Sequence, residues 1–190
     1  MSSITKTCAI VCLGAVLTCG PMSARALQSG DDFTLQSADG PLSLSELRGK
    51  VVLVFFGFTS CADVCPISLA RINAGFAKLS HDQLEQVRAL FISLDPERDS
   101  LEKLEAYTGY FHENIIGLRE ETAALNLVTA QFGIEYERVE MPDSVLGYGI
   151  SHSLDIFVID PSGTLVTELP HNTRPDVLVT NIRELLEPRE

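Results

Sequence analysis

Basic residues are scarce in this chain of 190 residues, which has 14 Lys and Arg against 26 Asp and Glu and a formal net charge of −12. An acidic surface repels phosphate backbones, so nucleic acid is excluded as an expected partner. Internal repeats, low-complexity stretches and long linkers are also missing after residue 30. With 45% apolar residues, the chain has room for one ordinary globular domain and little else.

Long apolar runs are missing too, since the run from Cys8 to Cys19 is far shorter than the ~20 residues that a membrane span needs. Lys6 precedes this run, and Ala24-Arg25-Ala26 follows it with a small-x-small pattern. These features are typical of a cleavable secretory signal. We therefore expect residues 1–26 to be removed and residues 27–190 to form a mature domain exported to the periplasm.

Two other readings of the N-terminal segment stay open. The segment could be retained as an anchor, which would place the domain on the outer side of the inner membrane. Lipidation at Cys19 is the weaker option, because Leu17-Thr18 is a poor match to the small residues that usually precede a lipidated cysteine. Apart from such an anchor, contact with a membrane is expected only through a partner.

Cysteine becomes scarce once residues 1–26 are removed, because only Cys61 and Cys65 of the five cysteines remain. Exported proteins occupy compartments in which disulfides form, so a lone close pair is either bonded or bound to a metal. A disulfide that closes so short a loop would stabilise a domain of this size only modestly. The pair therefore indicates chemistry, and a small structural disulfide is the competing interpretation.

Strands that alternate with helices predict an α/β fold, a single domain with a central mixed sheet flanked by helices. The run VVLVFFGF at 51–58 is rich in β-branched and aromatic residues and is typical of a strand buried on both faces. Further strands are predicted at 89–95, 154–160 and 164–169, helices from 66, from 101, across 121–133 and across 173–186, and a hairpin within 31–49.

The two cysteines lie between the buried strand at 51–58 and the first turn of a helix, where Pro66 is favoured. A helix N-terminus carries roughly half a positive charge, which favours thiolate over thiol. If the loop is helical, the four-residue spacing puts both sulfurs on one face. Two thiolates are soft ligands suited to Cu(I), and an imidazole suits both Cu(I) and Cu(II).

A third metal ligand would have to come from the histidines of the mature chain. His81 in a polar segment, His112 at a helix end and His171 in a polar turn are expected at the surface. His152 lies directly before the strand at 154–160, in a Gly-rich stretch expected to be a loop that approaches a site closely. Position alone leaves His152 open between a ligand and an ordinary loop residue.

Two further residues lie near the expected site. Asp95 ends the strand at 89–95 and either supports the site or only begins the turn at Asp95-Pro96. Tyr148 precedes His152 by four positions and either packs in the domain or supports the His152 loop. Phe58 and the neighbouring aromatic residues are expected to be core, with a possible role in keeping water from the site.

Four motifs together resemble the Sco/SenC family of copper chaperones, over about residues 31–186. They are FTSCADVCP (58–66), FISLDPERD (91–99), FHENIIGL (111–118) and YGISHSLDIFVID (148–160). The resemblance implies a thioredoxin-like fold and one copper ion, as Cu(I) or Cu(II), bound by Cys61, Cys65 and His152. It also implies delivery of copper to the copper site of cytochrome c oxidase, or reduction of the cysteines there.

The partners implied by this resemblance are the oxidase subunit that holds the copper site or another cuproprotein, with other copper carriers or thiol reductants. Two positions depart from the family pattern. Ala62 stands where Pro is common after the first cysteine, and Ser151 stands where Asp commonly precedes the ligand histidine. The missing carboxylate is expected to weaken support for Cu(II) binding.

Other functions remain as alternatives, and whether the protein is an enzyme stays open. An exported thiol–disulfide oxidoreductase would use the same pair, with Cys61 attacking, Cys65 resolving and a Cys61–Cys65 disulfide as the product. The C-x3-C spacing and His152 favour the metal over this redox function. A peroxiredoxin is disfavoured because the Pro-x3-Thr-x2-Cys pocket is absent, and structural zinc because only three good ligands are visible.

Overall fold

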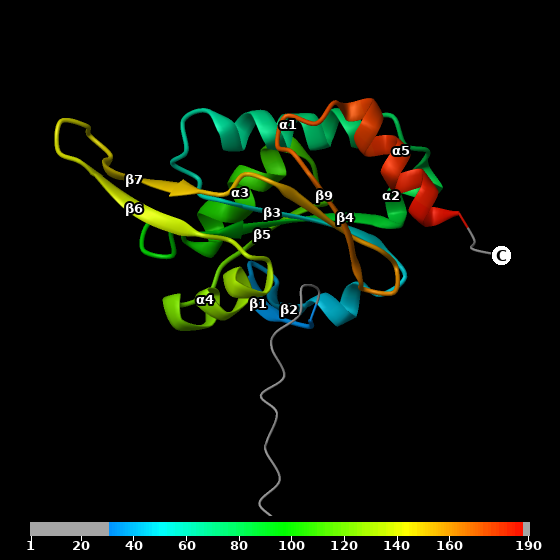
Figure 1. The fold of residues 1–190 in the computed structure, drawn as a ribbon, viewed down its shortest axis with the longest axis horizontal. Helices are drawn as coiled ribbons and strands as arrows, with labels where there is room; N and C mark the ends of the chain where they lie inside the picture. The colour runs from blue at the N-terminus through cyan, green and yellow to red at the C-terminus, as the bar shows by residue number, and fades with distance from the viewer. Residues whose placement is uncertain (1–30, 188–190) are drawn as a thin grey trace, which may run out of the picture.

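The computed structural model describes residues 31–187, so the predicted signal at 1–26 lies outside the described residues. A five-stranded sheet with the order β5-β4-β3-β8-β9 forms the centre of the domain (Figure 1). Its strands are β3 (Val51–Gly57), β4 (Val87–Ser93), β5 (Ile115–Leu118), β8 (Ile156–Ile159) and β9 (Leu165–Leu169). β3, β4 and β5 are parallel, and β8 and β9 run antiparallel to their neighbours. The predicted α/β architecture with a mixed sheet is confirmed.

Helices cover both faces of this sheet (Figure 1). They are α1 (Val64–Phe76), α2 (His81–Glu85), α3 (Leu101–Phe111), α4 (Thr122–Gln131) and α5 (Pro175–Leu186). α1, α3 and α5 pack on one face, whereas α4 packs on the other with the hairpin of β1 (Thr34–Ser37) and β2 (Gly40–Ser43) and the 3-10 helix η1 (Leu44–Leu47). Within residues 31–187, no helix combines the length and apolar character needed to cross a membrane.

Strand β3 is buried along its whole length, as the sequence predicts. Alternate side chains point to opposite faces of a strand, so the two apolar layers divide its residues between them. Val51, Leu53 and Phe55 belong to the layer under α1, α3 and α5, and Val52, Val54 and Phe56 belong to the layer over α4.

The topology gathers three connecting segments at one edge of the sheet. Gly57 at the end of β3 pairs with Ser93 at the end of the parallel strand β4. Because β8 is antiparallel, it begins at this same edge, where Ile156 pairs with Phe55. The segments that follow β3 and β4 and the segment that precedes β8 therefore meet here, at the kind of edge where ligands bind in α/β sheets.

The segment before β8 differs from the predicted loop. It is a hairpin of β6 (Tyr136–Met141) and β7 (Gly147–His152), which forms a separate two-stranded sheet and extends beyond the body of the domain (Figure 1). His152 is the last residue of β7 and pairs with Tyr136. The loop expectation was wrong because this strand contains Gly147 and Gly149 and lacks the apolar alternation that marks a half-buried strand. The short elements α2 and β5 were not predicted either.

Close packing of β5 against α3 leads to a prediction about stability. A Cβ atom on Gly117 would lie 2.8 Å from the Cβ of Leu104 and 3.0 Å from its backbone carbonyl. We expect Gly117→Ala to lower the free energy of unfolding by about 1–3 kcal/mol, because the helix backbone cannot give way as a flexible side chain would. Urea unfolding measures the change.

Gly109→Ala is the matched control, since a Cβ atom there would meet nothing within 4 Å and the residue lies in α3. Alanine in place of glycine in a helix stabilises by roughly 0.5–1 kcal/mol, so this variant should be slightly more stable than the parent protein. Equal effects of the two substitutions would contradict the packing argument.

Candidate metal centre

Cys61 and Cys65 lie where β3 passes into α1. The backbone N–H of Cys61 donates to the carbonyl of Phe58 at 3.2 Å, which closes a turn directly after the strand. Cys65 lies in the first turn of α1, and its backbone N–H donates to Sγ of Cys61 at 3.4 Å. Both thiols are free. The structure thus brings the two predicted cysteines together at a helix N-terminus, without a disulfide between them.

The two sulfurs differ in exposure. Cys65 is fully buried, whereas Cys61 is partly exposed. Sγ of Cys65 occupies the space above Gly57, because a Cβ atom on Gly57 would lie 2.7 Å from that sulfur and 2.7 Å from the ring of Phe91. The absence of a side chain at the end of β3 is therefore what makes room for the second sulfur.

The pair shares its charge unequally. The hydrogen bond from the thiol of Cys65, with help from the backbone N–H groups of Cys65 and Asp63, lowers the pKa of Cys61 to about 5. The same hydrogen bond and burial in the apolar core raise the pKa of Cys65 far above that of an ordinary thiol. At neutral pH the pair is therefore a partly exposed thiolate that accepts from a buried thiol.

His152 lies at the same edge of the sheet as the cysteines. Its ring packs edge-on against Phe58, with 6.1 Å between ring centres, and the strand β7 ends beside the loop after β3 (Figure 1). Nδ1 lies 2.6 Å from the carbonyl oxygen of Ser153, which can only accept, so Nδ1 carries the proton and Nε2 keeps its lone pair. Burial lowers the pKa of His152, so the imidazole is neutral near pH 7.

The three predicted ligands are neighbours, but they do not form one cluster. Within the part of the chain that the structure describes, no three His, Cys, Asp or Glu side chains converge closely enough to hold a metal ion. Cys61 and His152 are close enough to influence each other's pKa. Binding of one ion by all three residues would require His152 to approach the sulfurs.

A buried carboxylate that the sequence analysis did not assign to the site anchors the cysteine loop. Asp99 is 1% exposed and accepts from the backbone N–H of Thr59 at 3.0 Å, from the hydroxyl of Ser93 at 2.7 Å and from the hydroxyl of Thr59. Lys103 forms an ion pair with it at 3.2 Å, while Ser100 provides the helix cap. The available signal was an acidic residue a few positions after a buried strand, in D-P-E-R-D.

Of the other histidines, His81 and His112 precede β4 and β5 at the opposite edge of the sheet, whereas His171 follows β9, whose last residue Leu169 pairs with Ile156 at this edge. His81 is exposed and lies 3.4 Å from Glu85. His112 is partly buried, with its ring 5.3 Å from that of Phe76, so the surface expectation was wrong for this residue. Its Nδ1 accepts from the backbone N–H of Asn114, which leaves it a structural role at the end of α3.

Comparison with known proteins gives consistent matches along most of the chain. The family described as SCO1/SenC matches residues 22–187. A SCO2-like protein of Rickettsia conorii is 32% identical over 155 residues, which cover 81% of this chain and 75% of that protein. The mitochondrial protein SCO1 homolog 1 of Arabidopsis thaliana is 30% identical over 164 residues, 86% of this chain and 48% of the relative's length.

A solved structure agrees with these matches. The structure of Bradyrhizobium japonicum ScoI with copper bound superposes with a TM-score of 0.74, at 29% identity, and covers 83% of this chain and 99% of that one. This likeness confirms the predicted thioredoxin-like fold. The chain spans about half the length of the Arabidopsis relative and nearly all of the ScoI chain in that structure.

The unequal pair leads to a prediction about thiol reactivity. Because the thiolate is the reactive form, alkylation of Cys61 by iodoacetamide should accelerate as the pH rises through about 5 and then stay level. In Cys65→Ala the hydrogen bond from the second side chain is lost, so the inflection should move up toward the ordinary thiol value of about 8.5. Mass spectrometry measures the alkylated fraction over time, and an inflection near the ordinary value in the parent protein would contradict the assignment.

Proposed function

This chain belongs to the SCO1/SenC family, and from that membership and the paired sulfurs at the sheet edge we propose that it is an exported copper chaperone. The observation that carries the proposal is the contact between Cys61 and Cys65, with one sulfur already a thiolate at neutral pH. A chaperone must accept an ion and release it again, so its ligands have to be few and accessible. Cys61 is partly exposed and meets that need.

The donor set fits copper as the cargo. Thiolates are soft ligands that select Cu(I), and the described residues gather no set of four donors of the kind that structural zinc needs. Within residues 31–187 no further His, Cys, Asp or Glu joins the pair to form a cluster of three. The copper-bound structure of Bradyrhizobium japonicum ScoI supports the same cargo.

His152 is proposed as the third ligand. Its neutral imidazole with the lone pair on Nε2 is the form that binds metals. Two thiolates alone hold Cu(I), whereas Cu(II) is a harder ion that gains more from a nitrogen ligand. His152 is therefore proposed to matter most when the bound ion is Cu(II).

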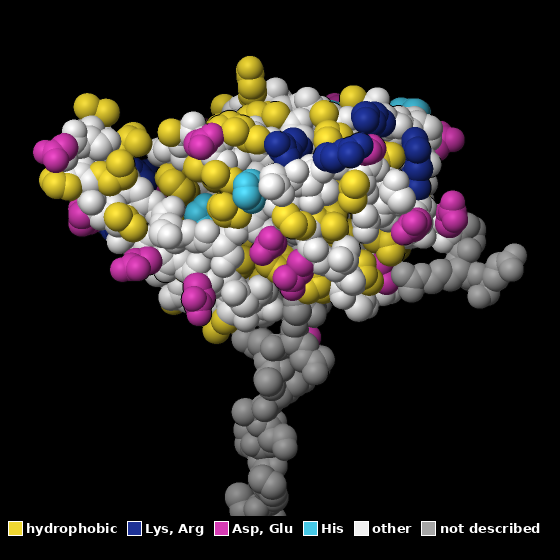
Figure 2. All heavy atoms as spheres, turned by 45° about the horizontal axis from the view of Figure 1, so that its top comes forward, with side chains coloured by type: hydrophobic (Ala, Val, Ile, Leu, Met, Phe, Trp, Pro, Cys, Tyr) yellow, Lys and Arg dark blue, Asp and Glu magenta, His cyan; other side chains and the backbone are white. Residues whose placement is uncertain are grey.

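The proposed acceptor is the copper-site subunit of cytochrome c oxidase or another cuproprotein outside the cytoplasm. Figure 2 shows hydrophobic side chains exposed around the protruding end of the domain, where the β6–β7 hairpin carries exposed Val139, Met141, Val145 and Leu146. Exposed apolar patches are typical of surfaces that contact other proteins. A protein acceptor approaching this end would meet the cysteines at the base of the hairpin. Export to the periplasm through residues 1–26 is part of the proposal.

A second function, thiol–disulfide exchange, is favoured by the low pKa of Cys61. The Cys61 thiolate would attack a disulfide sulfur of the substrate and release one substrate thiolate. Cys65, after losing its proton, would attack Cys61 in the mixed disulfide and release the second. The chain would end with a Cys61–Cys65 disulfide and the substrate with two thiols. Reduction of an acceptor's cysteines in this way is compatible with copper delivery.

Copper binding by the reduced protein tests the proposal directly. The protein should retain one copper ion in competition with a Cu(I) or Cu(II) chelator. Cys61→Ser or Cys65→Ser should abolish tight binding of both oxidation states, because each removes one of two thiolates. His152→Ala should weaken Cu(II) much more than Cu(I), with a change in the thiolate-to-Cu(II) charge-transfer band.

His81→Ala is the matched control, since that imidazole is exposed and lies away from the cysteines. It should retain copper as the parent protein does. Equal retention of copper by the parent protein and both cysteine variants would overturn the proposed site. No retained copper, with a readily exchanged Cys61–Cys65 disulfide, would make thiol–disulfide exchange the function instead.

Proton release offers an independent prediction. Near pH 7 Cys61 is already a thiolate while Cys65 keeps its proton, so Cu(I) binding by both sulfurs should release about one proton. At about pH 4, below the pKa of Cys61, the release should rise toward about two. Calorimetry in buffers of different ionisation enthalpy measures the number. Release of two protons near pH 7 would contradict the unequal pair.

A further inference from the structure

The position of the β6–β7 hairpin depends on side chains and not on the main sheet. The two strands pair only with each other, in a sheet separate from the five-stranded one. An isolated two-stranded hairpin is at best marginally stable in water. Since His152 ends β7, whatever holds the hairpin against the domain also holds the proposed third copper ligand.

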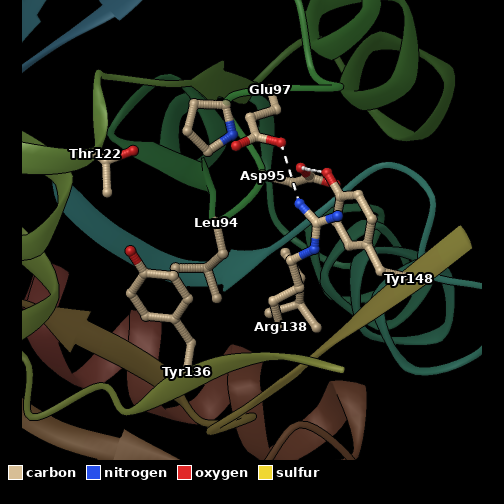
Figure 3. Close-up of a pocket in the computed structure, with 9 residues that line it drawn as sticks. Leu94, Asp95, Glu97, Thr122, Tyr136, Arg138 and Tyr148 are labelled. Carbon is tan, nitrogen blue, oxygen red and sulfur yellow. Dashed lines mark hydrogen bonds and ion pairs between the residues drawn. The ribbon is translucent and has the colours of Figure 1, made fainter. Parts of the chain in front are cut away.

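One face of the hairpin is turned toward the domain. The register pairs Tyr136 with His152, Arg138 with Ile150 and Glu140 with Tyr148, so these residues share one face. Four of them, Tyr136, Arg138, Tyr148 and Ile150, line a cavity of about 210 Å³ whose lining also includes Asp95 and Glu97 (Figure 3). The cavity shows that the hairpin is not packed continuously onto the domain. Tyr136 and Ile150 pack against the apolar core, and the hydroxyl of Tyr136 bonds to Asn126, while polar contacts at Tyr148 hold the rest of this face.

Those contacts form a closed triangle between the hairpin and the segment after β4. The hydroxyl of Tyr148 donates to Oδ1 of Asp95 at 2.7 Å (Figure 3), and Nε of Arg98 donates to Oδ2 of the same carboxylate. Nη1 of Arg98 donates to the backbone carbonyls of Leu146 and Tyr148, at 3.0 Å each. Charge-assisted hydrogen bonds of this kind are roughly twice as strong as neutral ones.

The ring of Tyr148 is clamped as well. The guanidinium carbon of Arg98 lies 3.5 Å from the ring centre, and that of Arg138 lies 3.6 Å from it. Two guanidinium groups cannot share one face at these distances, so they lie on opposite faces of the ring. Glu97 pairs with Arg138 at 3.3 Å (Figure 3). Glu140 pairs with the same side chain at 2.7 Å, and the two carboxylates hold it there.

Arg98 also lies close to the surroundings of His152. The guanidinium of Arg98 lies 6.0 Å from the ring centre of Phe58, and the ring of His152 lies 6.1 Å from the same ring. Phe58 is buried and immediately follows β3, so it is a fixed surface. Arg98 therefore contacts both the hairpin and the aromatic ring on which the imidazole rests.

We propose that Asp95, Arg98 and Tyr148 form a latch that positions His152 at the cysteine pair, and this inference rests on the proposed copper-binding function. The latch residues do not touch the ion and act through His152 as positioning residues. A released hairpin would let the imidazole leave the ring of Phe58 and the vicinity of Cys61. Burial and the hydrogen bond to Asp95 raise the pKa of Tyr148 to about 12, so the phenol remains a donor throughout the physiological range.

The consequence is a selective loss of Cu(II). Residues that orient a metal ligand typically contribute 10- to 100-fold to affinity, so Arg98→Gln or Tyr148→Leu should raise the Cu(II) dissociation constant by about 10-fold or more. The Cu(I) dissociation constant should change by less than about 3-fold, because two thiolates hold that ion without the imidazole.

The test is a double-mutant cycle with His152→Ala, measured by anaerobic chelator competition on the reduced protein. If the latch acts through His152, Arg98→Gln should weaken Cu(II) in the parent background and have almost no further effect in the His152→Ala background. The nitrogen hyperfine structure in the Cu(II) electron paramagnetic resonance spectrum should weaken in parallel. Equal losses in both backgrounds, or no loss in either, would overturn the latch.

Controls separate this result from other failures. Arg183→Gln removes an exposed arginine of α5 that donates to the backbone carbonyl of Lys78. It should leave the Cu(I) and Cu(II) dissociation constants unchanged. If Arg98→Gln does not fold, Tyr148→Phe provides the test, because it keeps the clamped ring and loses only the hydrogen bond to Asp95. This variant should raise the Cu(II) dissociation constant several-fold. An unchanged Cu(II) dissociation constant would overturn the latch. Copper retention by Cys61→Ser would instead signal failure of the proposed function.

Discussion

Burial of strand β3 on both faces is the constraint on which the rest of the structure depends. A shift of one residue would exchange the side chains of its two apolar layers, so the strand and its carboxyl end are fixed. Gly57 at that end leaves the space that Sγ of Cys65 occupies. Asp99 then ties Thr59, at the start of the cysteine loop, to the N-terminus of α3. The two sulfurs are thus held by the core and by a buried carboxylate, with no disulfide between them.

This arrangement gives two chemically identical thiols different pKa values, so that one keeps its proton and the other loses it. Cys65 is inside the apolar layer and acts as a donor, whereas Cys61 has partial access to solvent and carries the charge. A buried second thiolate would be costly without a cation beside it. A soft cation supplies that compensation, so the site is suited to change between a protonated pair and a metal-bound one. The same unequal pair is suited to thiol–disulfide exchange, which is the second function proposed for this site.

The cysteines and His152 are held with different firmness. The cysteines belong to the core of the domain. His152 belongs to a hairpin that is attached by the packing of Tyr136 and Ile150, a triangle of polar contacts and a clamped tyrosine. A proposed ligand such as His152, on a separately attached element, can approach or leave the two sulfurs without disturbing the sheet. That division suits a protein that has to release its cargo, because release then needs only a local change.

Sequence by itself determined the main strands and helices, since continuous or periodic apolar patterns such as 51–58 record burial directly. It also placed the cysteine pair at a strand-to-helix junction, because Cys61 and Cys65 are close in the chain. Only the tertiary structure decided what lies far apart in sequence: the β6–β7 hairpin, the distance between His152 and the sulfurs, and the contacts of Asp95 with Tyr148. Those depend on strand order and on polar side-chain contacts, which leave no periodic trace in the sequence. The apolar pattern of a segment indicates whether it is buried, whereas the strand order of the folded sheet determines which distant residues become neighbours.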